Sequence, residues 1–325
     1  MLSSHASSSN TQDAIHAANS TLSVPESITS DSVLHWIPIN FLQTNLSLVL
    51  INLFIILVLF VVAVQSIGVN YGTIVDDLLP ATEVIALYKT SGIGKMRIFY
   101  PNQATLQALK GSGISVIVGV VNNDLQGFAT SPIAANGWVQ TNISPYLPDV
   151  NISYIAARNE IKPSSFSDNA SAYINATTSF LVSTKAPLLA NVYPYFAYIS
   201  NPTDIKLDYA LLNSSGVVVQ DGNLGYQNLF DAMMDSLYSA LEKIGAANLT
   251  VIVIEIGWPS DGGVAATVDN AGTYYKNLIS HVNNGTTKRP RPLETYLFAL
   301  FDEDQKVVLY GHYSRNRAMC CLENR

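Results

Sequence analysis

Seven short and almost uninterrupted apolar runs constrain the fold of this 325-residue chain more than any other feature. The runs are rich in Val, Ile and Leu, and longer, more polar stretches separate them. A strand that is apolar on both sides is buried on both faces, which is typical of a parallel sheet covered by helices. The runs lie at 67–71, 95–100, 114–121, 152–157, 187–196, 249–256 and 294–301.

The stretches between these runs predict helical crossovers, which parallel strands require. Repeated βα units over about 240 residues favour an α/β fold of the (β/α)8 TIM-barrel type, whose usual length is about 250 residues. A doubly wound open sheet is the alternative, but no glycine-rich phosphate loop follows the first run to support a nucleotide-binding version. Helices are predicted over 80–91, 103–112, 132–143, 226–244 and 268–283.

One βα unit is missing from this pattern, because the chain has seven predicted strands instead of eight. The segment between Ile161 and Ala186 has room for one helix, from about Phe166 to Thr184, and not for a helix, a strand and a second helix. We therefore expect a barrel wall that is open at this place, with exposed strand edges.

Composition restricts the classes of ligand. A net charge of −7 with 13% charged residues argues against a nucleic-acid partner, which needs clustered Lys and Arg. Apolar residues make up 48% of the chain, enough for a sizeable core, and the 17 tyrosines suit a neutral, hydroxyl-rich ligand. The five histidines are scattered without ligand spacing, so we predict no metal site and no cofactor.

The N-terminal 66 residues are typical of a targeting segment. Residues 1–45 are rich in Ser and Asn and are predicted to be a disordered leader, whereas 46–64 are apolar over a length that spans a bilayer. No Lys or Arg precedes Lys89, so the positively charged flank of a signal peptide is missing. Three interpretations stay open for 46–66: a cleaved signal peptide, an uncleaved membrane anchor and a buried core helix.

Sequons for N-glycosylation are dense, which favours passage through the secretory pathway. They begin at Asn142, Asn151, Asn169, Asn175, Asn213, Asn248 and Asn284, with Asn19 and Asn45 upstream. The only cysteines, Cys320 and Cys321, are adjacent, so the chain has no disulfide framework and its cysteines do not identify the compartment.

Two glutamates directly follow apolar runs, Glu160 after IAARN and Glu255 after VIVI. Active sites of barrels lie at the C-terminal ends of the strands, where a charge without function or partner is costly. Each glutamate alone is also explained by a buried ion pair or a rim position, but the two together favour a catalytic pair. Glycoside hydrolysis uses one carboxylic acid to protonate the leaving oxygen and one carboxylate to attack the anomeric carbon.

From about Ile67 to Lys306 the chain resembles the plant members of glycoside hydrolase family 17, the endo-β-1,3-glucanases. The resemblance lies in the motifs IGVNYG, KMRIFYP, GVVNNDL, NE at 159–160, PLLANVYPYFAY, EIGWPS and FDEDQK. It implies a retaining endo-hydrolase of (1→3)-β-D-glucan with a barrel domain over 67–306 and no cofactor. We expect a monomer of the cell wall or vacuole, or else a membrane-anchored one.

The resemblance also implies roles for individual residues. Glu160 would be the acid/base and Glu255 the nucleophile. Asn159 would hold a substrate hydroxyl or position the acid, and Glu303 and Lys306 would tune the pair.

Aromatic and amide side chains near the strand ends are candidates for sugar binding. The rings are Tyr71, Tyr100, Tyr193, Phe196 and Trp258, and the amides are Asn122 and Asn191. Packing is the other interpretation of each ring. We favour packing for Phe196 and the cleft for Tyr193, and leave the other three open.

The sequence departs from the family in three ways. The missing βα unit, around strand 5, borders Glu160, and residues 307–325 form an aberrant tail in place of the closing segment. Arg158 stands where the family typically has glycine, and a cation there would lower the pKa of the acid. Asp302 and Asp304 replace asparagines. A catalytically weak or inactive glucan-binding relative, or a truncated product, is therefore the alternative to an active hydrolase.

Overall fold

The computed structural model describes residues 67–74, 78–157 and 168–301, with side chains from 175 onward in the last range. All of them belong to the second of two compact units, Leu57–Arg325. The predicted leader (1–45), the signal or anchor segment (46–66) and the C-terminal tail (307–325) lie outside these ranges. None of the described helices combines the length and the apolar character that a bilayer span requires.

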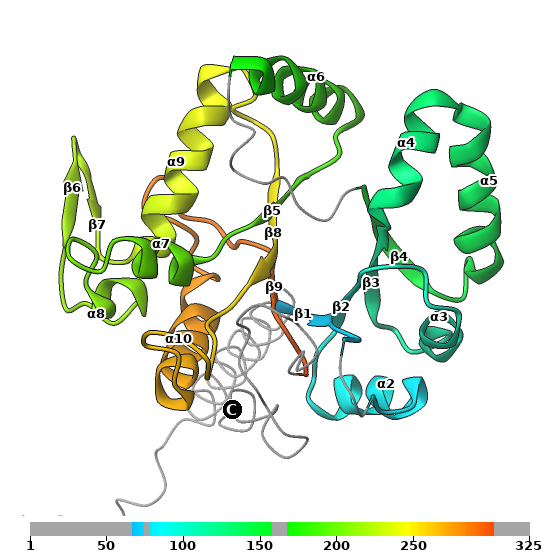
Figure 1. Cartoon of the computed structure of the whole chain (residues 1–325), viewed down its shortest axis with the longest axis horizontal. Coiled ribbons are helices and arrows are strands. Elements are labelled where there is room, and N and C mark those ends of the chain that lie inside the picture. The colour runs from blue at the N-terminus through cyan, green and yellow to red at the C-terminus, as the bar shows by residue number, and fades with distance from the viewer. Residues whose placement is uncertain (1–66, 75–77, 158–167, 302–325) are drawn as a thin grey trace, which may run out of the picture. The chain divides into compact units, whose positions relative to one another are not determined.

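The core of the fold is a parallel sheet of seven strands, in the order β4-β3-β2-β1-β9-β8-β5 (Figure 1). The strands are β1 (Ile67–Tyr71), β2 (Lys95–Ile98), β3 (Ser115–Val120), β4 (Asn151–Ala157), β5 (Leu188–Asn191), β8 (Val251–Ile256) and β9 (Thr295–Leu297). Each of the seven predicted strands is confirmed. The first and last strands pair in the middle of the sheet, with Val69 opposite Leu297, so the sheet curls as it does in a (β/α)8 barrel.

The sheet is an incomplete barrel. Among the described residues no strand joins β4 to β5, and the one helix between them is α6 (Asp168–Thr184), as the sequence predicted. Both strands are therefore edges in this part of the chain. The outer edge of β4 leaves Ile155 40% exposed, and α6 leaves Phe180 61% exposed. The missing unit thus places apolar side chains at the surface.

Helices cover the outer face of the sheet. The predicted ones are present as α2 (Ala81–Thr90), α3 (Gln103–Leu109), α5 (Pro132–Asn142), α6, α9 (Leu229–Lys243) and α10 (Val268–His281). Local chemistry fixes several of their starts: Asn102, Ser131, Asn228 and Thr267 each accept a hydrogen bond from a backbone N–H of the first turn. Pro132 occupies the first position of α5, where its missing N–H is harmless.

Sequence patterns missed several short elements. They are α4 (Asn122–Thr130), the 3-10 turn η2 (Ser144–Tyr146), α7 (Pro194–Ser200), α8 (Leu207–Ala210) and the hairpin of β6 (Val219–Asp221) and β7 (Leu224–Tyr226). Helix α4 begins with Asn122, Asn123 and Asp124 and has only Leu125 and Phe128 as large apolar residues, so its apolar pattern is short. The predicted strand 187–196 is too long: β5 ends at Asn191, and Pro194 starts α7 because proline fits the first turn of a helix.

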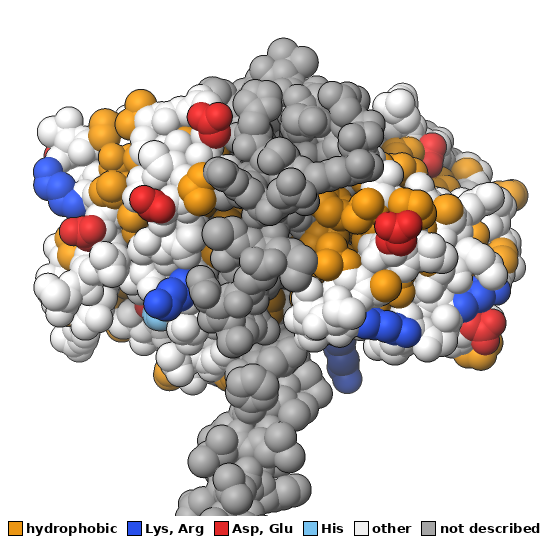
Figure 2. Space-filling model, turned by 90° about the horizontal axis from the view of Figure 1, so that it is seen from below, with side chains coloured by type: hydrophobic (Ala, Val, Ile, Leu, Met, Phe, Trp, Pro, Cys, Tyr) orange, Lys and Arg blue, Asp and Glu red, His pale blue; other side chains and the backbone are white. Residues whose placement is uncertain are grey.

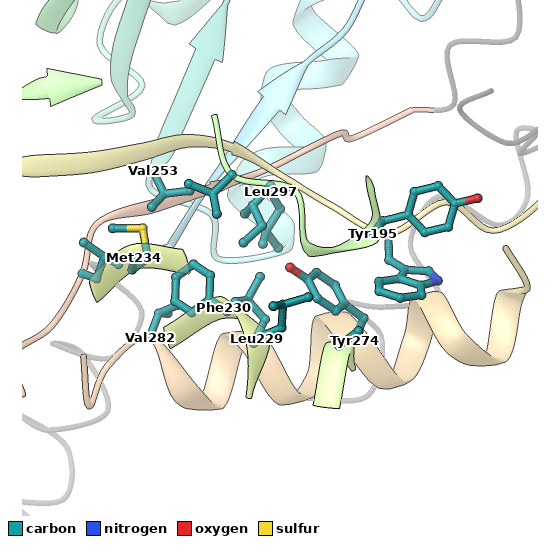
Figure 3. Packing of buried hydrophobic residues seen from close by; sticks show 14 of the residues in the cluster. Tyr195, Leu229, Phe230, Met234, Val253, Tyr274, Val282 and Leu297 are labelled. Carbon is teal, nitrogen blue, oxygen red and sulfur yellow. The ribbon is translucent and has the colours of Figure 1, made fainter. Parts of the chain in front are cut away.

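Two apolar clusters lie between the sheet and its helices, and a third lies on the inner side of the sheet. Phe230 of α9, Tyr274 of α10 and Val253 of β8 belong to the largest outer cluster (Figure 3). The inner cluster joins residues from strands far apart in the sheet: Ile117, Ala156, Ile252, Ile254 and Tyr296. Contacts between β3 or β4 and β8 or β9 on this side require a curled sheet.

Among the described residues visible in Figure 2, charged side chains do not gather in one patch. Lys, Arg, Asp and Glu stand there singly among polar and apolar side chains.

We predict that Phe230→Ala lowers the free energy of unfolding by about 3–5 kcal/mol, because Phe230 is fully buried and its removal leaves a cavity. Phe180→Ala is the matched control, since 61% of Phe180 is exposed, and it should change stability by less than about 0.5 kcal/mol. Urea denaturation of the two variants measures both values. Equal effects would show that the cluster around α9 does not form the core.

Candidate active site

Glu255 lies near the carboxyl end of β8 and is only 4% exposed. The Arg97 guanidinium donates from Nη1 to Glu255 Oε1 at 2.5 Å, forming an ion pair. The Tyr193 hydroxyl donates to the other oxygen, Oε2, at 3.0 Å. Both carboxylate oxygens therefore have a donor, one from strand β2 and one from the turn between β5 and α7.

Strand pairing around Glu255 is irregular. The register of β8 shifts against β9 between Val253 and Ile256, and against β5 between Ala190 and Asn191. Such bulges re-aim side chains and are common beside active sites. Ile256 packs in the outer cluster, whereas the Glu255 side chain meets Arg97 on the inner side. The irregular register thus accompanies a charged side chain that enters the barrel interior.

A second layer of hydrogen bonds holds Arg97 in place. Its Nη1 also contacts Asn70 Oδ1 and the Ile254 carbonyl, both at 3.2 Å. The Asn70 amide in turn donates to the carbonyls of Ile254 at 3.0 Å, Leu297 at 3.0 Å and Tyr296 at 3.3 Å. Four adjacent strands, β2, β1, β9 and β8, therefore meet in one polar network.

This arrangement suits an ionised, immobile carboxylate. A buried charge is tolerated when a partner of opposite sign and further hydrogen bonds replace the lost water, and Arg97 supplies the charge. The Arg97 Cζ atom also lies 4.5 Å from the centre of the Phe99 ring, which limits its movement. A carboxylate with fixed geometry can act as a nucleophile toward a carbon held above it.

The predicted aromatic residues have different environments. Trp258 lies in the core, 3% exposed, beside Tyr195 and Tyr274, and its Nε1 donates to the Ala265 carbonyl at 2.9 Å. Of the two interpretations left open for Trp258, the structure therefore supports packing.

Tyr71 is buried as well, with its ring edge against Phe301. Burial raises the pKa of the Tyr71 hydroxyl, and the neighbouring Tyr100 phenol raises it further. Tyr100 itself is 38% exposed.

Tyr193 is the aromatic residue that the structure joins to Glu255. It is partly buried, and its ring meets Phe196 at a centroid distance of 5.5 Å. Phe196 also contacts Tyr195 at 5.6 Å, yet keeps 40% of its surface exposed. Phe196 therefore packs against neighbouring rings at the surface of the fold.

The two predicted amides lie at the ends of strands. Asn122 is exposed at the first position of α4, and Asn191 is the last residue of β5, opposite Glu255 in the sheet. That they bind sugar hydroxyls stays a prediction.

Several predicted site residues lie outside the described ranges. They are Arg158, Asn159, Glu160, Asp302, Glu303, Asp304 and Lys306. The separation between the Glu160 and Glu255 carboxyls is therefore still a prediction. In the part of the chain that is described, no three His, Cys, Asp or Glu side chains form a group that could hold a metal ion.

Sequence reasoning missed Arg97 and Asn70 as members of the site. Both are polar residues between apolar neighbours in their strands, in KMRI and IGVNY, and both are at most 1% exposed. A buried arginine in a strand needs an acidic partner. An arginine in a buried strand therefore predicts an acidic partner, and Glu255 at the end of another strand is a candidate for that partner.

Comparisons with known proteins identify a family that the chain matches. The family model for glycosyl hydrolases family 17 matches residues 67–169 and 162–308. Its two matched segments meet in the stretch where the sequence lacks a βα unit.

Relatives with curated names match most of the chain. The glucan endo-1,3-beta-glucosidase of Vitis vinifera is 46% identical over 306 residues, covering 79% of this chain and 89% of that protein. The enzyme of the same name from Pisum sativum is 43% identical, with coverages of 80% and 84%. A basic vacuolar isoform from Nicotiana plumbaginifolia is 42% identical, with coverages of 74% and 80%.

Two solved structures share the fold closely. One, from a study of two plant beta-glucan endohydrolases with distinct substrate specificities, has a TM-score of 0.72 at 39% identity, covering 75% of this chain and 94% of that one. The other, a beta-1,3-glucanase and pollen allergen of Cryptomeria japonica, has a TM-score of 0.72 at 40% identity, with coverages of 76% and 94%.

We predict that Arg97 and Glu255 are strongly coupled in stability. Arg97→Met leaves a buried carboxylate without its cation and should lower the free energy of unfolding by about 3–5 kcal/mol. In the double variant Arg97→Met/Glu255→Gln the uncompensated charge is gone, so part of the loss should be recovered. Urea denaturation of the two single variants and the double variant measures a coupling energy, expected to exceed about 1 kcal/mol. Additive losses would contradict the network described above.

Proposed function

Because the chain belongs to glycosyl hydrolases family 17, we propose that it hydrolyses (1→3)-β-D-glucan as a retaining, endo-acting enzyme. Curated relatives that it covers over most of their length are named glucan endo-1,3-beta-glucosidases. The single structural observation that carries the proposal is the Glu255 carboxylate, fixed by Arg97 and Tyr193 at the carboxyl end of β8.

In the proposed first step, Glu255 attacks the anomeric carbon of a glucosyl unit while Glu160 protonates the departing glycosidic oxygen. The bond from the anomeric carbon to the leaving oxygen breaks, and an ester to Glu255 forms. In the second step Glu160 takes a proton from water, whose oxygen displaces Glu255 and restores the carboxylate. Asn159 positions the acid or a substrate hydroxyl, and Glu303 and Lys306 tune the pair.

Arg97 and Tyr193 act on the nucleophile without touching the sugar in this scheme. Their two donors fix the plane of the carboxylate, so that it meets the anomeric carbon without reorganising. The Tyr193 hydroxyl is the more accessible of the two donors, since its side chain is partly buried and Arg97 is 1% exposed.

Sugar binding is assigned to side chains near the same edge of the sheet. Exposed Tyr100 offers a ring face to glucose units, and Asn122 and Asn191 offer amides to hydroxyl groups. Tyr71 and Trp258, which are buried, support the site by packing.

We further propose that the chain follows the secretory pathway to the cell wall or the vacuole and acts as a monomer. Vacuolar isoforms occur among its relatives in Nicotiana plumbaginifolia and Nicotiana tabacum, and the dense sequons fit this route.

A second candidate is a glucan-binding protein with little or no catalysis. The observation that favours it is the open sheet: among the described residues β4, the strand that leads to Glu160, pairs only with β3. A displacement of the acid by about 1 Å can cost roughly 100-fold in rate.

Glu255→Gln tests the proposed function. It should reduce the release of reducing ends from laminarin by about 1000-fold or more, because the amide cannot form the glycosyl ester. Glu83→Gln, at an exposed position of α2, is the matched control and should retain activity. If wild type and Glu255→Gln are equally inactive while both bind a laminarin column, the binding protein is the better description.

Tyr193→Phe tests the positioning role. Loss of one hydrogen bond to a charged group should lower kcat by about 10- to 100-fold and change KM little. Tyr198→Phe in α7 is the matched control, because no hydrogen bond of the Tyr198 hydroxyl is found within the described ranges. A fall in kcat of the same size in both variants would contradict the specific role of Tyr193.

A further inference from the structure

The pairing of β8 with β9 changes at its carboxyl end, just beyond Glu255. The Phe298 N–H donates to the Ile256 carbonyl at 2.8 Å, as in a parallel ladder. In such a ladder the carbonyl of the same residue accepts from the N–H two positions further along the neighbouring strand, which here belongs to Trp258. The hydroxyl of Tyr275, from α10, takes part in the hydrogen bonding at this place.

The Tyr275 hydroxyl lies between the two strand ends. It donates to the Phe298 carbonyl at 2.6 Å and accepts a longer hydrogen bond from the Trp258 N–H at 3.4 Å. The hydrogen bond that would join the two backbones therefore runs through a side chain, and a hydroxyl oxygen separates the strand ends. We call this link of Trp258, Tyr275 and Phe298 the Tyr275 brace.

Gly257 leaves the room that the Tyr275 brace needs. A Cβ atom at this position would lie 2.5 Å from the Phe298 carbonyl oxygen and 2.8 Å from the Tyr275 hydroxyl. Both distances are much shorter than the usual contact between non-bonded heavy atoms, so the carbonyl or the hydroxyl would have to move. The turn after Glu255 thus accommodates the tyrosine because it contains glycine.

Two aromatic rings connect the Tyr275 brace with the supports of Glu255. The Phe298 ring is 7% exposed and meets Phe99 edge to face at a centroid distance of 6.2 Å. The Phe99 ring contacts the Arg97 guanidinium, which forms the ion pair with Glu255. On its other side the brace holds Trp258, which follows Glu255 closely in the chain. A displacement of either strand end is therefore transmitted to the carboxylate.

We propose that Tyr275 is a positioning residue for the nucleophile. Its hydroxyl sets the separation of β8 and β9 at their carboxyl ends, and thereby the position of Glu255 against Arg97. Tyr275 acts through Trp258 and Phe298 and not on the sugar. This role rests on the proposed function, because Glu255 is a nucleophile only in a retaining hydrolase.

The neighbouring Tyr274 provides the matched control. Its ring lies in the largest outer cluster, at a centroid distance of 5.4 Å from that of Trp258 (Figure 3). Its hydroxyl is buried and has no hydrogen-bond partner among the described residues. Tyr274→Phe therefore removes the same kind of atom from the same helix and leaves the Tyr275 brace intact, whereas Tyr275→Phe removes the brace and keeps the ring.

Labelling of Glu255 by 2-deoxy-2-fluoro-β-laminaribiosyl fluoride tests the positioning role in the full chain. A Glu255 carboxylate oxygen forms a bond to the anomeric carbon, and fluoride leaves without needing a proton, so the labelling rate reports on the nucleophile and not on Glu160. Tyr275→Phe should be labelled about tenfold more slowly than the wild type, because small displacements of a reacting group are costly. Tyr274→Phe should be labelled at the wild-type rate. Mass spectrometry measures the rates and should find one label per chain at completion in each protein, which excludes unfolded molecules as the cause of a lower rate.

The outcomes separate this role from the proposed function. If the wild type is labelled at Glu255 and Tyr275→Phe is labelled equally fast, or if both tyrosine variants are slowed alike, the positioning role is wrong and the retaining function stands. If the wild type is not labelled at all, the retaining function fails and the positioning role fails with it. With laminarin, Tyr275→Phe should lower kcat by about tenfold and change KM by less than about twofold. A change in KM alone would contradict the positioning role.

Amide hydrogen exchange tests the Tyr275 brace itself, without substrate. The Trp258 N–H loses its acceptor in Tyr275→Phe and should exchange about tenfold faster or more. The Val253 N–H donates to the Glu294 carbonyl at 3.0 Å, at the other end of the same strand pair, and should keep its rate. An unchanged rate at Trp258, or an equal increase at both amides, would overturn the proposal.

Discussion

The buried ion pair between Arg97 and Glu255 is the interaction on which the candidate site depends. Taking both charges out of water is costly, and the pair is tolerated only when its geometry is good and the remaining hydrogen-bond groups are satisfied. Asn70 contributes to this by linking Arg97 to the carbonyls of β8 and β9. The position of the nucleophile is thus set by the sheet as a whole.

The ion pair and the gap involve different strands of the sheet, although β5 at the gap pairs directly with β8. The polar network uses β2, β1, β9 and β8, which are consecutive and central in the strand order, whereas the open edges are β4 and β5. Losing a βα unit between β4 and β5 therefore leaves Arg97 and Asn70, which support the nucleophile from β2 and β1, in place. The gap instead borders the strand that leads to Glu160 and the turn that carries Tyr193. The gap therefore affects Glu160, the proposed acid, and Tyr193, the second hydrogen-bond donor to Glu255.

Sequence alone predicted the seven strands, most of the longer helices and the strand-end position of Glu255, because apolar runs and their spacing are local signals. It did not predict that Arg97 would meet Glu255, since their contact spans 158 positions and depends on how the sheet curls. Helix α4 was missed because it begins with three polar residues and has only Leu125 and Phe128 as large apolar residues. The length of β5 was overestimated because an apolar run continues through Pro194 into a helix.

The pairing of β1 with β9 has a consequence for the folding of the domain during its synthesis. The Asn70 amide finds its carbonyl partner at Leu297 across 227 positions, and every such contact closes a very long loop of chain. Contacts between residues so far apart in the sequence form late in folding, because the chain loses the entropy of closing the loop before the contact stabilises it. A ribosome must therefore release nearly the whole domain before Asn70 and Arg97 are satisfied. Until then the N-terminal half carries polar groups in strands that have no barrel interior to enter, and its apolar surface and unpaired strand edges favour aggregation.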